Sequence, residues 1–232
     1  MAQPDSKLQI VIPLFENVTH LDFTAPHQVL SRAPQAQVVV ASIGGRDIAA
    51  EGLVFAGLQD LARIERCDLL CVPGGLGATD AIEDEAFMHE IRRLGSGAKY
   101  LTSVCTGSLV LGAAGFLTGR RAACHWAWRE LLEPFGAIVD TRRVARDGNI
   151  ITGGGVTAGL DFAFTVLAEI AGEEFAQTVQ LGLEYAPDPP FDAGRPELAP
   201  PQVLEAYNRR LGPLVASRRA AVAQAARRLL PA

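Results

Sequence analysis

The chain has 232 residues, of which 49% are hydrophobic and 20% are charged, so it can bury the core of one globular domain spanning residues 1–232. The formal net charge of -5 provides no basic surface for nucleic acid, and Arg142, Arg143 and Arg146 are interpreted as a solvated face. The N-terminus lacks the pattern of a signal peptide, and no apolar run reaches membrane-spanning length. These features predict a cytoplasmic protein that binds neither nucleic acid nor a membrane.

Strand patterns alternate with helical patterns along the chain. In chain order they predict a strand at 8–14, a helix at 24–30, a strand at 37–42, a short antiparallel excursion over 44–57, a strand at 67–72, a helix at 86–96, a strand at 100–104, a helix at 107–114, a strand at 121–125, a helix at 126–133, a hairpin over 144–152, and helices at 156–171 and 173–183. Thr24 is the expected cap of the first helix. This alternation predicts an α/β fold with a doubly wound, mainly parallel sheet flanked by helices.

The remaining C-terminal part differs in composition. The proline-rich segment 186–201 is incompatible with regular structure and is expected to run over the surface. A helix at 202–230, rich in alanine and arginine, is expected to pack on the domain with one face in solvent.

Four cysteines are too few for a disulfide framework in a chain of this length. Cys67 and Cys71 flank an apolar run and are assigned to the core, and no pair of cysteines has the two-residue spacing of a zinc site. We therefore expect reduced thiols and neither a metal nor another cofactor.

Cys105 is the leading candidate for a nucleophile. An apolar strand stops at this residue and a helical pattern follows, so the thiol is expected at a turn that lifts it clear of the sheet. The amides of the first helical turn are expected to lower its pKa by favouring the thiolate. Thr106 follows directly, and its backbone amide is expected to face a developing oxyanion. Gly74 and Gly75 can supply a facing amide or simply form a tight turn.

A thiolate needs a neighbour that transfers protons, and Asp22, Glu51 and His125 are the candidates. Because the carboxyl ends of parallel strands share one edge of a sheet, Asp22 is expected to lie near Cys105. Asp22 can instead cap the first helix, although Thr24 is better placed to do so. His125 lies in an apolar strand end, where a histidine satisfied within the core is the alternative.

The turn at 73–75, the elbow at 103–107 and the segment 21–26 together resemble the PfpI superfamily over almost the whole chain. Three further segments are similar to those of its isocyanide hydratases: 124–126, 147–161 and 180–194. The resemblance implies a flavodoxin-like PfpI-type sandwich with a nucleophile elbow, assembled as a homodimer. Many members have a histidine after the nucleophile and a glutamate as the acid, whereas this chain has Thr106 and Asp22, the pattern of the isocyanide hydratases.

By position, the resemblance implies that Cys105 is the nucleophile, Asp22 the general acid and base, and Thr106 a helper at the developing anion. The implied reaction adds water to an organic isocyanide through a thioimidate on Cys105 and releases an N-substituted formamide. The glycine triplet around Gly154 and the following Val156 would border the pocket. Further pocket candidates, each of which can instead belong to the core, are His125, Trp126 and Phe23.

Two alternatives remain open. A glyoxalase or deglycase of the same superfamily would direct the thiolate at an aldehyde, a reaction for which Thr106 lacks the acidity of a histidine. A non-catalytic ligand-sensing domain related to AraC-type regulators would carry a similar elbow. Those regulators continue into two helix-turn-helix units, whereas this chain has one predicted helix after Pro201.

Overall fold

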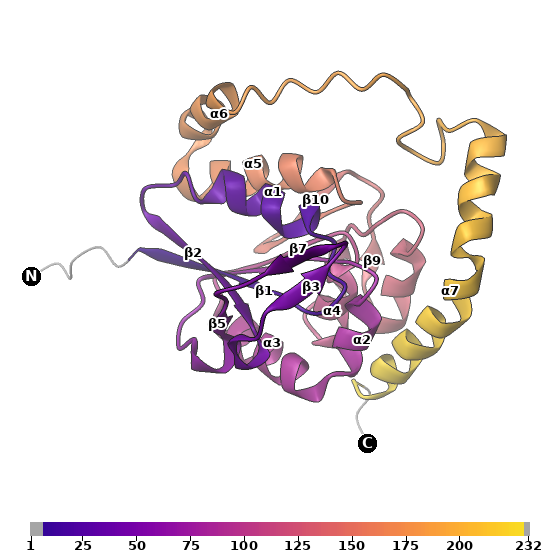
Figure 1. Ribbon diagram of the computed structural model, residues 1–232, viewed down its shortest axis with the longest axis horizontal. Helices are drawn as coiled ribbons and strands as arrows, with labels where there is room; N and C mark the ends of the chain where they lie inside the picture. Colours follow the sequence, from indigo (N-terminus) through magenta and orange to yellow (C-terminus); the bar gives the residue numbers. More distant parts are fainter. Residues whose placement is uncertain (1–6, 230–232) are drawn as a thin grey trace, which may run out of the picture.

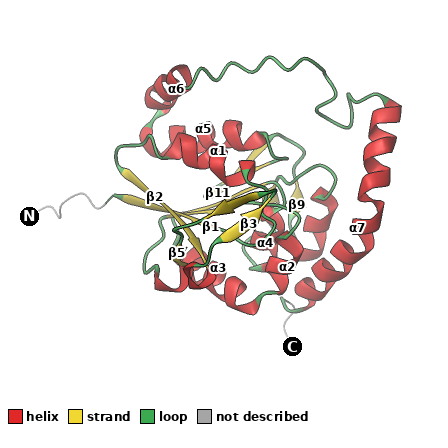
Figure 2. Ribbon diagram, viewed as in Figure 1, coloured by secondary structure: helices red, strands yellow, loops and turns green. Residues whose placement is uncertain are grey.

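The computed structural model describes residues 7–229, and its centre is a seven-stranded sheet in the order β10-β11-β7-β6-β1-β2-β5 (Figures 1 and 2). All strands are parallel except β10, which pairs antiparallel with β11. The strands are β1 (Leu8–Pro13), β2 (Ala36–Ser42), β5 (Gln59–Asp60), β6 (Leu69–Val72), β7 (Tyr100–Val104), β10 (Val144–Asp147) and β11 (Ile150–Gly153). This order confirms the predicted doubly wound, mainly parallel sheet.

Helices cover both faces of the sheet (Figure 1). One face carries α1 (Leu21–Leu30) and α5 (Ala158–Ala171), which pack against each other, and α6 (Glu173–Gly182) packs beside α5. The other face carries α2 (Ala78–Glu83), α3 (Glu85–Gly97) and α4 (Gly107–Ala113), and α7 (Pro201–Arg227) contacts α2 and α4 from the side. Two small sheets pair β3 (Ile48–Ala50) with β4 (Leu53–Phe55) and β8 (Arg121–Ala122) with β9 (Ile138–Val139).

The central strands are buried on both faces, as the continuous apolar runs predict. Every residue of β6 and β7 is buried, including two polar residues of β7. Thr102 donates to the carbonyl of Leu70 at 2.9 Å, and the hydroxyls of Ser103 and Ser108 lie 2.8 Å apart. These bonds satisfy the buried hydroxyls and tie β7 to its neighbours.

Three local predictions were wrong. Helix α1 begins at Leu21 rather than Thr24, because the Glu51 carboxylate, 31 residues away, accepts from the amide of His20 at the helix start at 3.2 Å. The helix predicted at 126–133 is a 3-10 helix over Arg129–Phe135, which contains Pro134 and so lacks one amide donor. The short helix α2 was not predicted, and the strand predicted at 121–125 covers only Arg121–Ala122.

Between α6 and α7 the chain carries no helix or strand and is largely exposed, and it arches away from the domain (Figure 1). The predicted C-terminal helix extends to residue 230, which lies outside the described residues, and the assignment of 1–232 to one domain stays a prediction. Among residues 7–229, no helix has the length and hydropathy needed to cross a membrane.

Four neighbouring strands, β11, β7, β6 and β1, deliver their carboxyl ends to one edge of the sheet. The segments after them contain Gly154, Cys105, Gly74 and Asp22, respectively. Residues far apart in sequence therefore meet at this edge, where ligands bind in open α/β sheets.

Gly107 allows α4 to start directly against β6. A Cβ there would lie 2.1 Å from the carbonyl oxygen of Val72, a backbone atom that cannot move aside. We expect Gly107→Ala to lower the free energy of unfolding by about 2 kcal/mol. Gly97→Ala is the control, because a Cβ there meets nothing within 4 Å, and its free energy of unfolding should stay unchanged or rise by about 0.5 kcal/mol. Urea denaturation measures both, and equal effects would contradict this explanation.

Candidate active site

Cys105 lies on a strained turn between β7 and α4. Its φ is 57°, in the left-handed region that non-glycine residues rarely adopt. The Cys105 amide donates to the carbonyls of Gly154 at 2.8 Å and Gly153 at 3.1 Å, which fixes the elbow against the segment after β11. The predicted strand-to-helix elbow is therefore present, and neighbouring backbone holds its conformation.

The Gly74-Gly75 turn lies directly against the elbow. The Gly75 amide donates to the Thr106 hydroxyl oxygen at 2.9 Å, and this hydroxyl lies 3.1 Å from the Gly75 carbonyl, to which it donates. The Gly74 amide donates to Oδ2 of Asp22 at 3.0 Å. A Cβ on Gly74 would lie 2.5 Å from the Thr106 nitrogen and 2.9 Å from Asp22 Oδ2, so only glycine fits.

These contacts change the role expected for the turn. Both glycine amides donate to side chains of the protein, whereas an amide that faces an oxyanion was one of the two roles expected for them. The Thr106 amide is the donor that interacts with the Cys105 sulfur. Gly74 and Gly75 thus position Asp22 and Thr106 rather than offering free donors to a ligand.

Asp22 is fully buried in the first turn of α1 and faces the Cys105 thiol. Burial raises the pKa of Asp22 from 3.8 to about 7, the Gly74 amide and the Cys105 thiol oppose this rise, and the negative charge of Glu51 adds to it. Oδ1 of Asp22 has no hydrogen-bond partner among the described residues. A carboxyl group with this pKa exchanges its proton readily near neutral pH.

Cys105 differs from the expectation of a lowered thiol pKa. The residue is 5% exposed, and burial raises the pKa of its thiol well above the ordinary value. The negative charges of Asp22 and Cys124 raise it further, and the Thr106 amide opposes them without reversing the direction. Desolvation of the thiolate therefore outweighs the amides of the elbow, and the thiol is protonated at neutral pH beside an Asp22 carboxyl whose pKa is about 7.

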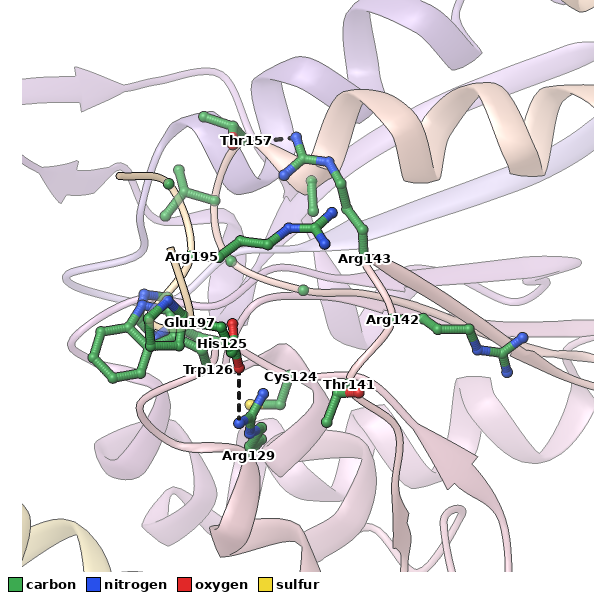
Figure 3. Close-up of a pocket in the computed structure, with 16 residues that line it drawn as sticks. Cys124, His125, Trp126, Arg129, Thr141, Arg142, Arg143, Thr157, Arg195 and Glu197 are labelled. Carbon is green, nitrogen blue, oxygen red and sulfur yellow. Dashed lines mark hydrogen bonds and ion pairs between the residues drawn. The ribbon is translucent and has the colours of Figure 1, made fainter. Parts of the chain in front are cut away.

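A cavity of about 250 Å³ (Figure 3) is bordered by Gly154, whose carbonyl accepts from the Cys105 amide, whereas Cys105 and Asp22 do not line it. Four of the predicted pocket residues line it: His125, Trp126, Gly154 and Val156. Phe23 instead lines a different cavity, where its ring packs edge-on against Phe55 at 4.8 Å, and its role at the active site stays a prediction.

Four arginines contribute to the same cavity, namely Arg129, Arg142, Arg143 and Arg195. Arg143 pairs with Asp161, and Arg142 pairs with Asp140 at 2.5 Å and extends away from the cavity (Figure 3). The interpretation of Arg142 and Arg143 as a merely solvated face was therefore incomplete, because both also line the cavity that Gly154 borders.

His125 is held by its local surroundings. Its ring stacks on Trp126 with centroids 5.8 Å apart, and Nδ1 accepts from the amide of Ala127 at 3.2 Å. Burial and the charge of Arg218 lower the pKa of His125 to about 4. His125 is therefore neutral near pH 7 and shapes the cavity instead of acting as an acid.

Arg218 was not among the predicted site residues, and α7 brings it against the Gly74-Gly75 turn. Nη2 of Arg218 donates to the carbonyls of Gly75 at 3.4 Å and Leu76 at 3.2 Å. The available signal was its place in the buried stripe of α7, which consists of Arg218, Ala221, Val222 and Ala225 at helical spacing.

All four cysteines are unpaired and buried. Over the described range 7–229, no group of three or more histidine, cysteine, aspartate or glutamate side chains is arranged to hold a metal ion.

A family model described as the DJ-1/PfpI family matches residues 8–169. The chain belongs to this family. It is 46% identical over 229 residues to an isonitrile hydratase from Pseudomonas putida, covering 96% of this chain and 98% of the relative. A crystal structure of a ThiJ/PfpI family protein from Pseudomonas syringae superposes with a TM-score of 0.88 at 36% identity, covering 95% of this chain and 90% of that one.

A transcriptional regulator also matches part of the chain. The HTH-type transcriptional regulator GlxA from Rhizobium meliloti is 31% identical over 154 residues, which cover 65% of this chain and 48% of the regulator. The match to the isonitrile hydratase therefore extends over a larger share of both sequences.

Replacing Asp22 tests the cost of burying its carboxylate. Because the folded pKa of about 7 lies above the ordinary 3.8, the stabilising contribution is present below about pH 4 and is lost as the pH rises through 7. At about 1.4 kcal/mol per pH unit, the carboxylate opposes folding by up to about 4 kcal/mol at pH 8. We expect Asp22→Asn to gain stability relative to wild type between pH 4 and pH 8. Urea denaturation across this range measures the difference, and a difference independent of pH would refute the assignment.

Proposed function

We propose that this protein is an isocyanide hydratase that converts an organic isocyanide and water into an N-substituted formamide. The observation that carries the proposal is the buried Asp22 carboxyl, with a pKa of about 7, facing the Cys105 thiol. The 46% identity to an isonitrile hydratase over 96% of the chain supports it, since isonitrile and isocyanide denote the same functional group.

The first step joins the Cys105 sulfur to the terminal carbon of the isocyanide. The Asp22 carboxylate takes the thiol proton as the C–S bond forms and passes it to the same carbon. The product is a neutral thioimidate, R–N=CH–S, on Cys105. Because the thiol is protonated at rest, Asp22 generates the nucleophile only when substrate is present.

The second step adds water to the thioimidate carbon. Asp22 takes a proton from the water as the C–O bond forms and delivers it to the nitrogen, giving R–NH–CH(OH)–S. The C–S bond then breaks, the hydroxyl proton returns to sulfur by way of Asp22, and the formamide leaves. One carboxyl group with a pKa near neutrality performs each transfer, and only one water is consumed.

Thr106 supports both steps in this scheme. Its amide interacts with the Cys105 sulfur and stabilises negative charge as the thiol is deprotonated. Its hydroxyl binds the Gly75 amide and carbonyl, which keeps the turn that orients Asp22 in place. The cavity lined by Trp126, Gly154 and Val156 would receive the organic group of the substrate.

The two alternative functions, a glyoxalase or deglycase and a ligand-sensing domain, explain fewer features of the active site. A glyoxalase or deglycase would benefit from a charged histidine, whereas His125 has a pKa of about 4 and is neutral. A ligand-sensing domain needs no carboxyl group with a raised pKa beside a thiol. We also propose a homodimer, supported by exposed apolar side chains on β4 and α7, among them Val54 and Val203.

The central test is turnover of an aryl or alkyl isocyanide by the purified protein, with the formamide measured by chromatography. We expect wild type to produce formamide, and Cys105→Ala and Asp22→Asn each to lower kcat by at least about 1,000-fold, because each removes a reacting group. Cys67→Ala is the matched control, since Cys67 is also a buried thiol but lies away from Asp22, and its kcat should stay near wild type. Absence of turnover by wild type would contradict the hydratase proposal and favour a glyoxalase or deglycase. Turnover by the Cys105→Ala variant at the wild-type rate would contradict covalent catalysis by Cys105.

The pH dependence of kcat/KM tests whether Asp22 must be deprotonated before it can accept the proton of the Cys105 thiol. Below a pH of about 7 Asp22 is protonated and cannot accept the thiol proton, so kcat/KM should fall about tenfold for each further pH unit. Glu51→Gln removes a negative charge that raises the pKa of Asp22, so this acid limb should move to lower pH. The glutamine oxygen can still accept from the His20 amide, which preserves the start of α1. Glu65→Gln, at an exposed site, is the control, and equal profiles for the two variants would contradict the role of Glu51.

A further inference from the structure

Arg218 is a buried cation without a buried anion to balance it. The residue is 3% exposed, and within residues 7–229 it forms no ion pair. Its Nη1 has no hydrogen-bond partner there either. Removing a guanidinium from water without a counter-ion is expensive, and the two carbonyls bound by Nη2 offset only part of that cost.

Arg218 contacts Trp128 and the turn that follows β6. Its guanidinium lies 4.5 Å from the centroid of the Trp128 ring, and Nη2 binds the carbonyls of Gly75 and Leu76. The Gly75 carbonyl also accepts from the Thr106 hydroxyl, so two donors from different elements hold this peptide group. Gly75 has a φ of 146°, a conformation that favours glycine.

Holding the Gly75 carbonyl fixes the atoms on the other side of the same turn. The Gly75 amide binds Thr106, and the preceding Gly74 amide binds Oδ2 of Asp22. Displacement of the turn would therefore move the proton-transfer group and the residue after the nucleophile together. Arg218 acts on the reacting atoms through this turn rather than by touching them.

The charge of Arg218 also reaches the thiols. Burial lowers the pKa of the Arg218 guanidinium, a negative charge formed on Cys105 or Cys124 opposes that shift, and Arg218 in turn opposes the rise in the pKa of Cys124 that burial causes. The titratable groups that face Arg218 or the Cys105 thiol from the surrounding elements are Asp22, Asp80, Cys124, His125 and Tyr207. His125 is neutral at neutral pH, so Arg218 carries the positive charge within this group of residues.

We propose that Arg218 is a positioning residue of the active site, which holds the Gly74-Gly75 turn in place and supplies a fixed positive charge that favours anionic sulfur at Cys105. The consequence for turnover rests on the proposed hydratase function, whereas the consequence for the Cys105 thiol does not. Helix α7 thus contributes a functional side chain to a site built by the parallel sheet.

The test measures alkylation of Cys105 by iodoacetamide between pH 6 and pH 10, with the modified peptide quantified by mass spectrometry so that the other cysteines do not interfere. We expect Arg218→Met to slow alkylation at pH 8 at least fivefold and to move the pH midpoint upward. Arg218→Lys, which keeps the charge, should recover most of the rate. Arg219→Met removes the neighbouring exposed arginine of the same helix and should match wild type.

Thermal unfolding identifies the variants that fold. If Arg218→Met does not fold, Arg218→Gln, which keeps a hydrogen-bond donor without the charge, takes its place with the same expected slowing. A folded uncharged variant with the alkylation profile of wild type would overturn the proposal, as would equal slowing by Arg219→Met. Alkylation needs no isocyanide, so the alkylation rates test the role of Arg218 even if the protein does not hydrate isocyanides. If wild type turns over an isocyanide, Arg218→Met should lower kcat for that substrate more than it raises KM.

Discussion

The contact between a buried carboxyl group and a buried thiol is the constraint on which the rest of the site depends. Burial raises the pKa of both groups, and the negative charge of Asp22 raises that of the Cys105 thiol further, whereas the Cys105 thiol lowers the pKa of Asp22. The thiol therefore keeps its proton near neutral pH, where the Asp22 carboxyl gains or loses its own. The surrounding backbone keeps the two groups together despite the cost of their burial.

Glycine makes this arrangement possible at two places. At Gly74 the absence of a side chain lets the turn after β6 approach Asp22 and Thr106 closely, and at Gly107 it lets α4 begin against the end of β6. The elbow itself contains a non-glycine residue with a positive φ, because the nucleophile needs a side chain. Backbone contacts from Gly153 and Gly154 hold Cys105 in that conformation.

Sequence similarity and geometry support the same assignment from independent directions. Family membership rests on residues 8–169, which span the sheet and its covering helices, whereas the match to the isonitrile hydratase extends over 96% of the chain. That additional length includes α7, which carries Arg218 to the turn beside the active site. The part of the chain that a generic DJ-1/PfpI domain model leaves out is thus in contact with the site.

The sequence by itself determined the order of strands and helices, the elbow at Cys105 and the meeting of Asp22 with it, because hydrophobic periodicity and the shared edge of a parallel sheet are properties of local pattern and topology. Tertiary structure alone decided the start of α1, the direction of the Cys105 pKa shift, the use of the Gly74 and Gly75 amides and the burial of Arg218. Each of these depends on desolvation or on a contact between residues distant in sequence, such as Glu51 with His20 or Arg218 with Gly75. Local sequence carries no information on how much water a folded neighbour excludes.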